Sequence, residues 1–294
     1  MTLGRAIRGV ALVSAIVAPL GAQQARPDAH VTMADLDSMS MPFVPGGHWL
    51  ATRPASQTAA DALSLGPVTP PAISPNGIAY FARPNGSLLR PDTRVYQLTL
   101  KRDTTTIPLG IRTVTVTESM LGGVVGWLIA ESRTGTPVAT ADSLFLLRAD
   151  LTPQRWAAAI GRAQLAVSFT PDSMFAALQD YRGRSSFSAA VPPGALITPG
   201  MIERVVEMLP LAAGYRSAAT VVQVESGTPR AVPASIAVVG TENVLLSDRT
   251  VDCWVVALRA QTTETRLWVS RDAARVVKSE QLTSGGVLTG VLQE

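Results

Sequence analysis

The only cysteine of the chain lies in the sequence VDCWVVALRA, residues 251–260, next to one of five tryptophans. A nucleophilic cysteine needs its thiolate form, which a helix N-terminus or a neighbouring His or Lys usually stabilises. Cys253 instead alternates with Val251, Val255 and Ala257 in a strand-like run. Free cysteines are among the residues most often buried in proteins. We therefore predict an inert thiol in the core.

Other catalytic chemistry has little support. Both histidines, His30 and His48, lie in an irregular N-terminal stretch, and there is no G-x-S-x-G nucleophile elbow. Zinc-spaced His and Cys clusters and calcium loops of the D-x-[DN]-x-[DN]-G type are absent. The dipeptides Asp37-Ser38, Asp142-Ser143 and Asp172-Ser173 are typical of turns or caps. We expect a protein that is not an enzyme, with no catalytic residue, metal or cofactor; a hydrolase with an unusual site stays the alternative.

The N-terminus has the pattern of a secretory signal peptide. Arg5 and Arg8 precede an apolar stretch from about residue 9 to 18, and small residues follow at Gly21-Ala22. The apolar stretch is too short to span a bilayer, which takes roughly 20 residues. We predict a signal peptide over residues 1–22, no integral membrane segment after its cleavage, and a periplasmic or secreted protein.

Charge and aromatic content argue against a nucleic-acid partner. Without residues 1–22, 23 basic residues face 22 acidic ones, a net charge of +1. Aromatic residues make up only 5% of the chain and are not interleaved with basic clusters. A single cysteine also excludes an internal disulfide, so the chain must fold on its hydrophobic core alone.

The domain organisation follows from composition and periodicity. A Pro-, Ala- and Ser-rich irregular segment spans residues 23–75, and one β-rich domain spans 76–294. In residues 199–209, Ile202, Val205, Val206 and Leu209 have the i, i+3, i+4, i+7 spacing of an amphipathic helix. Period-two runs with turn residues between them predict an antiparallel meander. The predicted strands are 78–82, 93–102, 111–119, 127–132, 143–148, 164–169, 185–191, 218–224, 234–239, 251–259, 265–270, 275–281 and 287–292.

Several predicted strands are apolar on both faces. In residues 251–260 one face holds Cys253 and Val255 and the other holds Trp254 and Val256, although a strand with one wet face should alternate apolar and polar residues. Either the helix and the N-terminal segment cover the second face, or that face meets a ligand. On the second interpretation, the candidate ligand-binding residues are Trp127, Phe145, Trp254, Leu267 and Trp268.

The C-terminal half resembles an uncharacterised family of exported bacterial β-rich domains of unknown function. The resemblance is carried by Asp252-Cys253-Trp254-Val255-Val256, by Trp268-Val269-Ser270 with Val276-Val277-Lys278, and by the hairpin SLFLLRADLTPQR. It covers roughly residues 90–294. The family is similar in architecture to periplasmic lipoprotein-carrier proteins, which implies a curved half-open barrel with a helix on its concave side. Carriers of that shape hold acyl chains.

We therefore expect a mainly β protein: a curved antiparallel meander forming a half-open barrel, with one helix at about 199–209 packed on the sheet. The expected function is non-catalytic binding of a lipid or other apolar ligand. The alternative is a protein–protein interaction or scaffold module of the cell envelope.

Overall fold

Alternation of apolar and polar side chains determines the strands. In residues 92–102, for example, Tyr96 and Leu98 are buried on one face, while Val95 and Gln97 are only partly buried on the other. The computed structural model describes residues 79–294, except 83, 137–139, 193, 198–199, 226–227, 262 and 284. The predicted signal peptide, the segment 23–75, both histidines and Asp37-Ser38 lie outside the described residues.

The described residues form 15 strands, one α-helix and a short 3-10 helix. The bounds of the helices are Gly86–Leu88 for η2 and Gly200–Glu207 for α2. Those of the strands are β1 Asp92–Arg102, β2 Thr105–Leu121, β3 Val124–Thr134, β4 Thr140–Leu147, β5 Pro153–Ile160, β6 Ala163–Phe169, β7 Ser173–Asp180, β8 Gly183–Ala190, β9 Leu196–Ile197, β10 Arg216–Glu225, β11 Thr228–Leu245, β12 Thr250–Ala260, β13 Thr263–Ser270, β14 Val276–Thr283 and β15 Gly286–Gln293.

All of these strands belong to one curved sheet that does not close into a barrel. Its order is β8-β7-β6-β5-β4-β3-β2-β1-β15-β14-β13-β12-β11-β10-β9. Two antiparallel meanders, β1 to β8 and β10 to β15, meet where β1 pairs with β15 and Tyr96 lies opposite Leu292. Only the short β9 pairs in parallel, with β10. The predicted mainly β, half-open architecture is confirmed.

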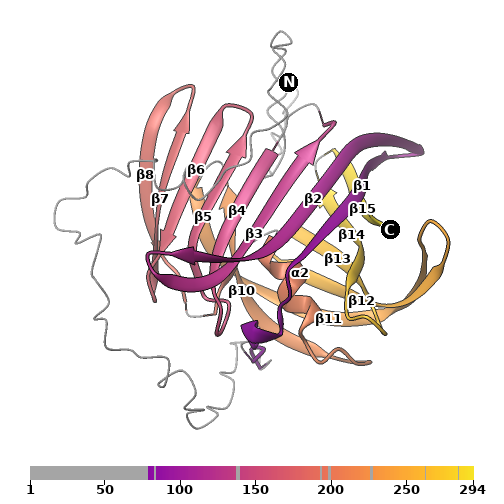
Figure 1. The fold of residues 1–294 in the computed structure, drawn as a ribbon. Helices are drawn as coiled ribbons and strands as arrows, with labels where there is room; N and C mark the ends of the chain where they lie inside the picture. Colours follow the sequence, from indigo (N-terminus) through magenta and orange to yellow (C-terminus); the bar gives the residue numbers. More distant parts are fainter. Residues whose placement is uncertain are drawn as a thin grey trace, which may run out of the picture.

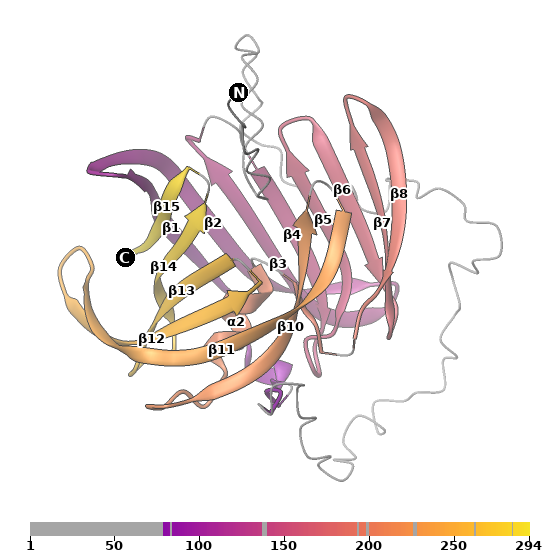
Figure 2. The same ribbon diagram turned by 180° about the vertical axis from the view of Figure 1, so that it is seen from behind.

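The sheet curves around α2, which both ribbon views show between the two meanders (Figures 1 and 2). The predicted helix is therefore confirmed in place, over Gly200–Glu207 rather than 199–209. A helix of eight residues has little stability alone in water. The packing of α2 against the sheet must hold it, and six of its eight residues are buried: Met201, Ile202, Glu203, Arg204, Val205 and Val206.

Some local predictions were wrong. Strands β5, β7 and β9 lie outside the predicted runs. The predicted strand 78–82 is reduced to one isolated parallel bridge between Tyr80 and Ala218, with Ile78 outside the described residues. Asp142-Ser143 lies inside β4 rather than in a turn. Asp172-Ser173 does lie at a turn, where the Ser173 backbone N–H donates to Thr170 Oγ1 (3.1 Å).

The sequence Pro84-Asn85-Gly86 leads into η2. Asn85 Oδ1 accepts a hydrogen bond from the Ser87 backbone N–H (3.0 Å), so Asn85 is the N-cap of η2. Only glycine fits at position 86, because a Cβ there would lie 2.2 Å from the carbonyl oxygen of Arg148. Within the part of the chain described, no helix combines the length and hydrophobicity needed to cross a bilayer.

Candidate binding site on the concave face of the sheet

The concave face is the face of the sheet that packs against α2. Strand register determines which side chains share it: Arg94 and Tyr96 of β1 lie opposite Val114 and Arg112 of β2. Val114 in turn lies opposite Glu131 of β3. Paired residues of neighbouring strands point to the same side, so the same apolar face that carries Tyr96 and Val114 also carries arginine and glutamate.

A buried ion-pair network connects this face to the helix. Arg112 Nη1 donates to Glu203 Oε1 of α2 (2.6 Å), and Arg112 Nη2 donates to Glu131 Oε2 (2.7 Å). Arg133 forms a further ion pair with Glu131 (3.0 Å). The side chain of Arg112 is only 5% exposed and that of Glu131 only 2%. Arg112 is thus a buried bridge between α2 and two strands.

A second group of charges holds the C-terminal end of α2. Arg94 pairs with Glu207 and also donates through Nε to Asp92 Oδ2 (2.6 Å). Arg204 Nη1 contacts Glu207 Oε2 (3.2 Å) and lies 3.6 Å from Asp92 Oδ2. Glu207 Oε1 also accepts from the Val276 backbone N–H of β14 (2.7 Å). The helix is therefore tied to both meanders.

Burial and neighbouring charges shift the pKa values of several of these groups. Burial opposes ionisation of Glu131, but the positive charges of Arg112 and Arg133 outweigh it and lower its pKa to about 2. Burial raises the pKa of Asp142 on β4 to about 6, and the nearby charge of Glu131 adds to that rise. Burial, together with the charge of Glu203, raises the pKa of Tyr96 to about 12. Glu131 and Asp142, which lie opposite one another on β3 and β4, thus titrate in different pH ranges.

The network leaves several buried polar atoms without a hydrogen-bond partner among the described residues. The unpaired donors are Arg112 Nε and Arg204 Nε and Nη2, and the unpaired acceptors are Glu203 Oε2 and Asp92 Oδ1. Arg204 is fully buried. Unpaired buried polar groups are costly and rare in folded proteins, so five such atoms in one ion-pair network are unusual.

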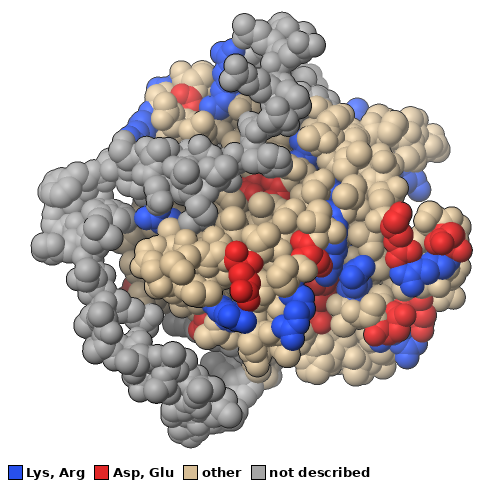
Figure 3. All heavy atoms as spheres, viewed as in Figure 1, with Lys and Arg blue, Asp and Glu red and all other residues tan. Residues whose placement is uncertain are grey.

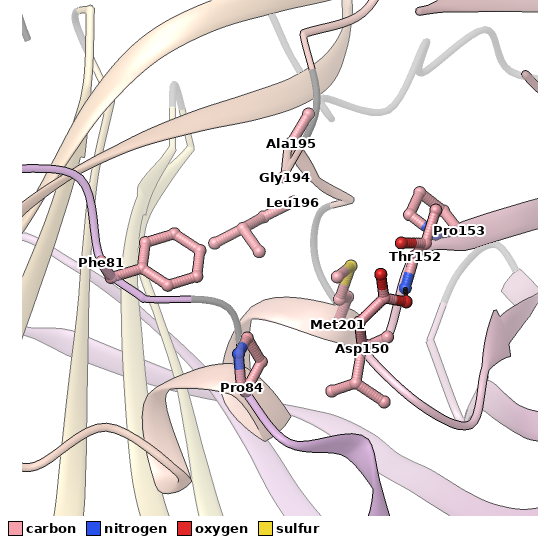
Figure 4. A pocket seen from close by; sticks show the side chains of 10 residues that line it. Phe81, Pro84, Asp150, Thr152, Pro153, Gly194, Ala195, Leu196 and Met201 are labelled. Atoms are coloured by element: carbon pink, nitrogen blue, oxygen red, sulfur yellow. Dashed lines mark hydrogen bonds between the residues drawn. The ribbon is translucent and has the colours of Figure 1, made fainter. Parts of the chain in front are cut away.

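Buried side chains of α2 pack on the concave face. A cavity of about 10 Å³ lies beside the N-terminal end of α2, lined by Phe81, Pro84, Leu151, Leu196 and Met201 among others (Figure 4). That volume has room for about one water molecule. Helix α2 occupies the space inside the curve of the sheet.

The five predicted ligand-binding residues do not gather in one place. Trp127, Trp254 and Leu267 lie on the concave face, and β3 is separated from β12 by five strands in the sheet order. Phe145 and Trp268 lie on the opposite face. All five except Trp254 are buried. Their role in ligand binding stays a prediction.

Cations lie over the rings of both C-terminal tryptophans. The Arg271 guanidinium is 4.5 Å from the Trp254 ring centroid, and Lys278 Nζ is 3.9 Å from that of Trp268. Such cation–π contacts contribute roughly 0.5–2 kcal/mol each. Because the two rings lie on opposite faces of the sheet, these contacts belong to two separate environments.

Trp127 has a structural role that can be measured. Its indole Nε1–H donates to the Gly86 carbonyl oxygen (2.9 Å) and so fastens η2 to β3. Replacing Trp127 by Phe removes this donor and leaves the buried Gly86 carbonyl oxygen with only the hydrogen bond from the Leu89 backbone N–H (3.2 Å). We expect the free energy of unfolding to fall by about 1–2 kcal/mol, measured by urea denaturation. An unchanged midpoint would show that water replaces the indole at Gly86.

The structure confirms that Cys253 is buried in the middle of a strand. The side chain is fully buried in β12, and Sγ contacts the Val251 carbonyl oxygen (3.4 Å). Burial raises the pKa of the thiol to about 11, and the negative charge of Asp252 acts in the same direction.

Cys253 should therefore react slowly with thiol reagents. At pH 8 we expect the folded protein to react with Ellman's reagent at least about a hundredfold more slowly than the unfolded chain, because thiolate is scarce and access is blocked. The chain has one cysteine, so the absorbance change reports this thiol alone. Equal rates in buffer and in denaturant would contradict a buried thiol.

Sequence reasoning did not identify the ion-pair network. One signal was present: Arg94 alternates with Tyr96 and Leu98, and Arg112 alternates with Val114 and Val116, so both arginines occupy apolar-face positions. Arginine is seldom fully buried unless it is paired. An arginine at such a position in two successive strands therefore indicates buried acidic partners.

Charges on the surface have a different arrangement. On the face shown in Figure 3, acidic and basic side chains lie next to one another. Exposed ion pairs such as Arg259–Glu264 (2.7 Å) and Arg271–Asp252 (2.6 Å) follow this pattern. Among the side chains that the structure describes, no three His, Cys, Asp or Glu residues are grouped so as to hold a metal ion.

Comparison with known proteins gives a family but no activity. A crystal structure of the beta-barrel-like protein of domain of unknown function DUF1849 from Brucella abortus aligns with 69% of this chain and 96% of its own, at 9% identity and a TM-score of 0.45. No curated protein sequence matches. The profile of the family "Protein of unknown function (DUF3108)" matches residues 95–287, from the early part of β1 into β15. The chain therefore belongs to the DUF3108 family.

Proposed function

We propose that this protein is a non-catalytic binding module that takes up a lipid or other apolar ligand on the concave face of its sheet. In this proposal the protein acts in the periplasm or outside the cell, and the site is the space that α2 occupies. The observation that carries the proposal is the position of α2, an eight-residue helix between β9 and β10 inside the curve of a half-open sheet.

The composition of the concave face supports this proposal. Side chains from both meanders line this face, and many of them are apolar: Leu98, Val114, Val116, Trp127, Ile129, Ile236, Val256, Leu258 and Leu267, all buried. An acyl chain on such a surface would gain roughly 0.8 kcal/mol for each buried CH₂ group. Removal of α2 would uncover an apolar surface extending over both meanders.

Ligand uptake then requires α2 to move, because a cavity of about 10 Å³ cannot hold an acyl chain. The short helix is suited to this, since it is held by tertiary contacts rather than by its own helix propensity. The strands have extensive backbone pairing on both sides and would stay in place. A bound state would differ from the present structure chiefly at residues 200–207.

Native mass spectrometry of the full chain, purified without detergent, tests the proposal together with solvent extraction of the sample. We expect a reproducible lipid-like adduct. Adding that lipid to stripped protein should accelerate amide hydrogen exchange in residues 200–207, while exchange in β1, β2 and β12 stays slow. A mock purification from the same cells controls for carried-over lipid. A clean apo mass, with no exchange change on adding lipid, would contradict the proposal.

A protein–protein interaction module is the second candidate. It is favoured by the β2–β3 hairpin, whose tip exposes Met120, Val124 and Val125 around Gly122 and Gly123. Exposed apolar side chains gathered at one place are typical of interaction sites. If this function holds, sedimentation should show a concentration-dependent assembly that the double substitution Met120→Ser and Val125→Ser abolishes.

A further inference from the structure

The arginines beneath α2 offer a site for an anion on an otherwise apolar surface. Arg94 and Arg112 stand on neighbouring strands of the concave face, on either side of Tyr96. The Arg112 guanidinium lies 5.3 Å from the Tyr96 ring centroid. Guanidinium groups bind carboxylates and phosphates with paired, charge-assisted hydrogen bonds. In the present structure, carboxylates of α2 occupy both arginines.

The side chains of α2 combine carboxylate and aliphatic groups. Glu203 pairs with Arg112 and Glu207 pairs with Arg94, one helical turn apart. Between and beside them the helix buries only aliphatic and thioether side chains apart from Arg204: Met201, Ile202, Val205 and Val206. To the sheet, the helix presents carboxylate oxygens next to hydrocarbon. A fatty acid presents the same two groups.

Charge balance gives the expected charge of a replacement ligand. Helix α2 carries two glutamates and one arginine, a net charge of −1. A ligand that displaces the helix leaves the sheet residues in place: Arg94, Arg112 and Arg133 with Asp92 and Glu131 in the ion pairs, and Asp142 opposite Glu131. A monoanionic ligand would replace the charge of the helix.

An unpaired atom of the network agrees with this chemistry. Arg112 Nε, which belongs to the sheet and stays when α2 is displaced, is a buried donor without a partner among the described residues. The oxygens of an anionic head group would accept from such a donor.

We propose that Arg94 and Arg112 form a head-group site for a single-chain amphiphile with one negative charge, and that Glu203 and Glu207 of α2 occupy this site in the ligand-free protein. The inference rests on the proposed binding function and names its ligand class. The ligand displaces α2 by replacing its carboxylates at the arginines and its aliphatic side chains on the apolar face.

A head-group series on the unmodified protein tests the proposal without any substitution. The probes are dodecanoate, dodecanol and dodecylamine, each below its aggregation limit at pH 7.5, with binding followed by calorimetry. Hydrogen bonds to charged groups predict that dodecanoate binds at least about tenfold more tightly than the other two. Equal binding of all three would overturn the head-group site while leaving apolar binding in place. Binding of none would overturn both proposals.

Two substitutions in the Arg112–Glu203 ion pair distinguish two roles of Glu203. Either its carboxylate occupies the site of the ligand's head group, or the pair only holds the helix in place. Glu203→Gln removes the competitor, and we expect the affinity for dodecanoate to rise by about tenfold. Arg112→Gln removes the receptor group, and we expect the affinity to fall by a similar factor. Both substitutions break the same pair and loosen α2. If the pair only holds the helix, both substitutions should therefore shift the affinity for dodecanoate in the same direction. That result would overturn the proposal that Glu203 occupies the head-group site.

The exposed pair of Arg259 and Glu264 provides matched controls. Glu264→Gln and Arg259→Gln make the same chemical changes on β13 and β12, at side chains that are 29% and 57% exposed. Neither should alter dodecanoate affinity. A shift as large as that of Glu203→Gln would show that overall charge, rather than the site beneath α2, determines binding, and would overturn the proposal.

Discussion

Replacing Arg112 by Gln is expected to lower the free energy of unfolding by about 3–5 kcal/mol, the cost of breaking a buried ion pair by removing one partner. Arg112 bridges Glu131 of β3 and Glu203 of α2, and burial of all three side chains excludes water as a substitute partner. The carboxylate of Glu203 would remain in the core without the guanidinium that balances its charge. Urea denaturation at pH 7 measures the loss.

The pH dependence of the same variant gives a second check. The pKa of Glu131 is lowered to about 2 in the folded protein, below its ordinary value of 4.5. Its stabilising contribution is therefore complete above about pH 4.5 and is lost as the pH falls towards 2. Without Arg112, only Arg133 still favours the ionised form. We expect the variant to lose less stability than the unmodified protein between pH 4.5 and 2.

Arg259→Gln is the control, because Arg259 is exposed and its partner Glu264 is partly exposed, and ion pairs at the surface contribute about 0–1 kcal/mol. Simultaneous replacement of Arg112, Glu131 and Glu203 by Leu should be far less damaging than the single substitution, since no buried charge is left alone. A loss below 1 kcal/mol for Arg112→Gln would contradict a dry, buried network.

The outline of the fold was predictable because strand periodicity is local information. The runs that became β1 and β2 alternate clearly, and those that became β12 to β15 contain many Val, Leu and Thr residues. Strands β5 and β7 contain alanine runs, at 157–159 and 176–177, and alanine is depleted in strands. They form strands because neighbouring strands on both sides pair with them.

Helix α2 shows where pattern reasoning stops. Its apolar residues Ile202, Val205 and Val206 are correctly expected to be buried. The same reasoning places Glu203 and Arg204 on a solvent-facing side, yet both are buried against the sheet. The sequence of an eight-residue segment does not show that the sheet curves round it. It also does not show that its glutamates form ion pairs with Arg94 and Arg112.

Whether the predicted ligand-binding residues share one face depends on the pairing register of the strands, which the sequence does not give. Trp254 and Trp268 can share a face only if the β12–β13 hairpin has suitable pairing. A shift of one residue moves every side chain of a strand to the other face. In the structure Val255 lies opposite Trp268 and Trp254 lies opposite Val269. The two tryptophans therefore point to opposite faces.

Replacing Asp142 by Asn is expected to raise the free energy of unfolding at pH 7.5 by up to about 3 kcal/mol. Burial and the charge of Glu131 raise the pKa of Asp142 from 3.8 to about 6, and each unit corresponds to 1.36 kcal/mol. The folded protein therefore binds a proton that the unfolded chain releases between pH 3.8 and 6. Stability from this group is complete below 3.8 and lost as the pH rises through 6.

Asn at position 142 stays neutral at every pH and can still accept the hydrogen bond that Trp156 Nε1 donates to Oδ1 (2.9 Å). The gain should therefore disappear as the pH falls below about 4, which denaturation curves between pH 3.5 and 7.5 would show. Asp252→Asn at the exposed pair with Arg271 is the control, with a change within about 1 kcal/mol. An equal gain from Asp142→Asn at both pH extremes would mean that packing, rather than a buried charge, limits stability beside Glu131.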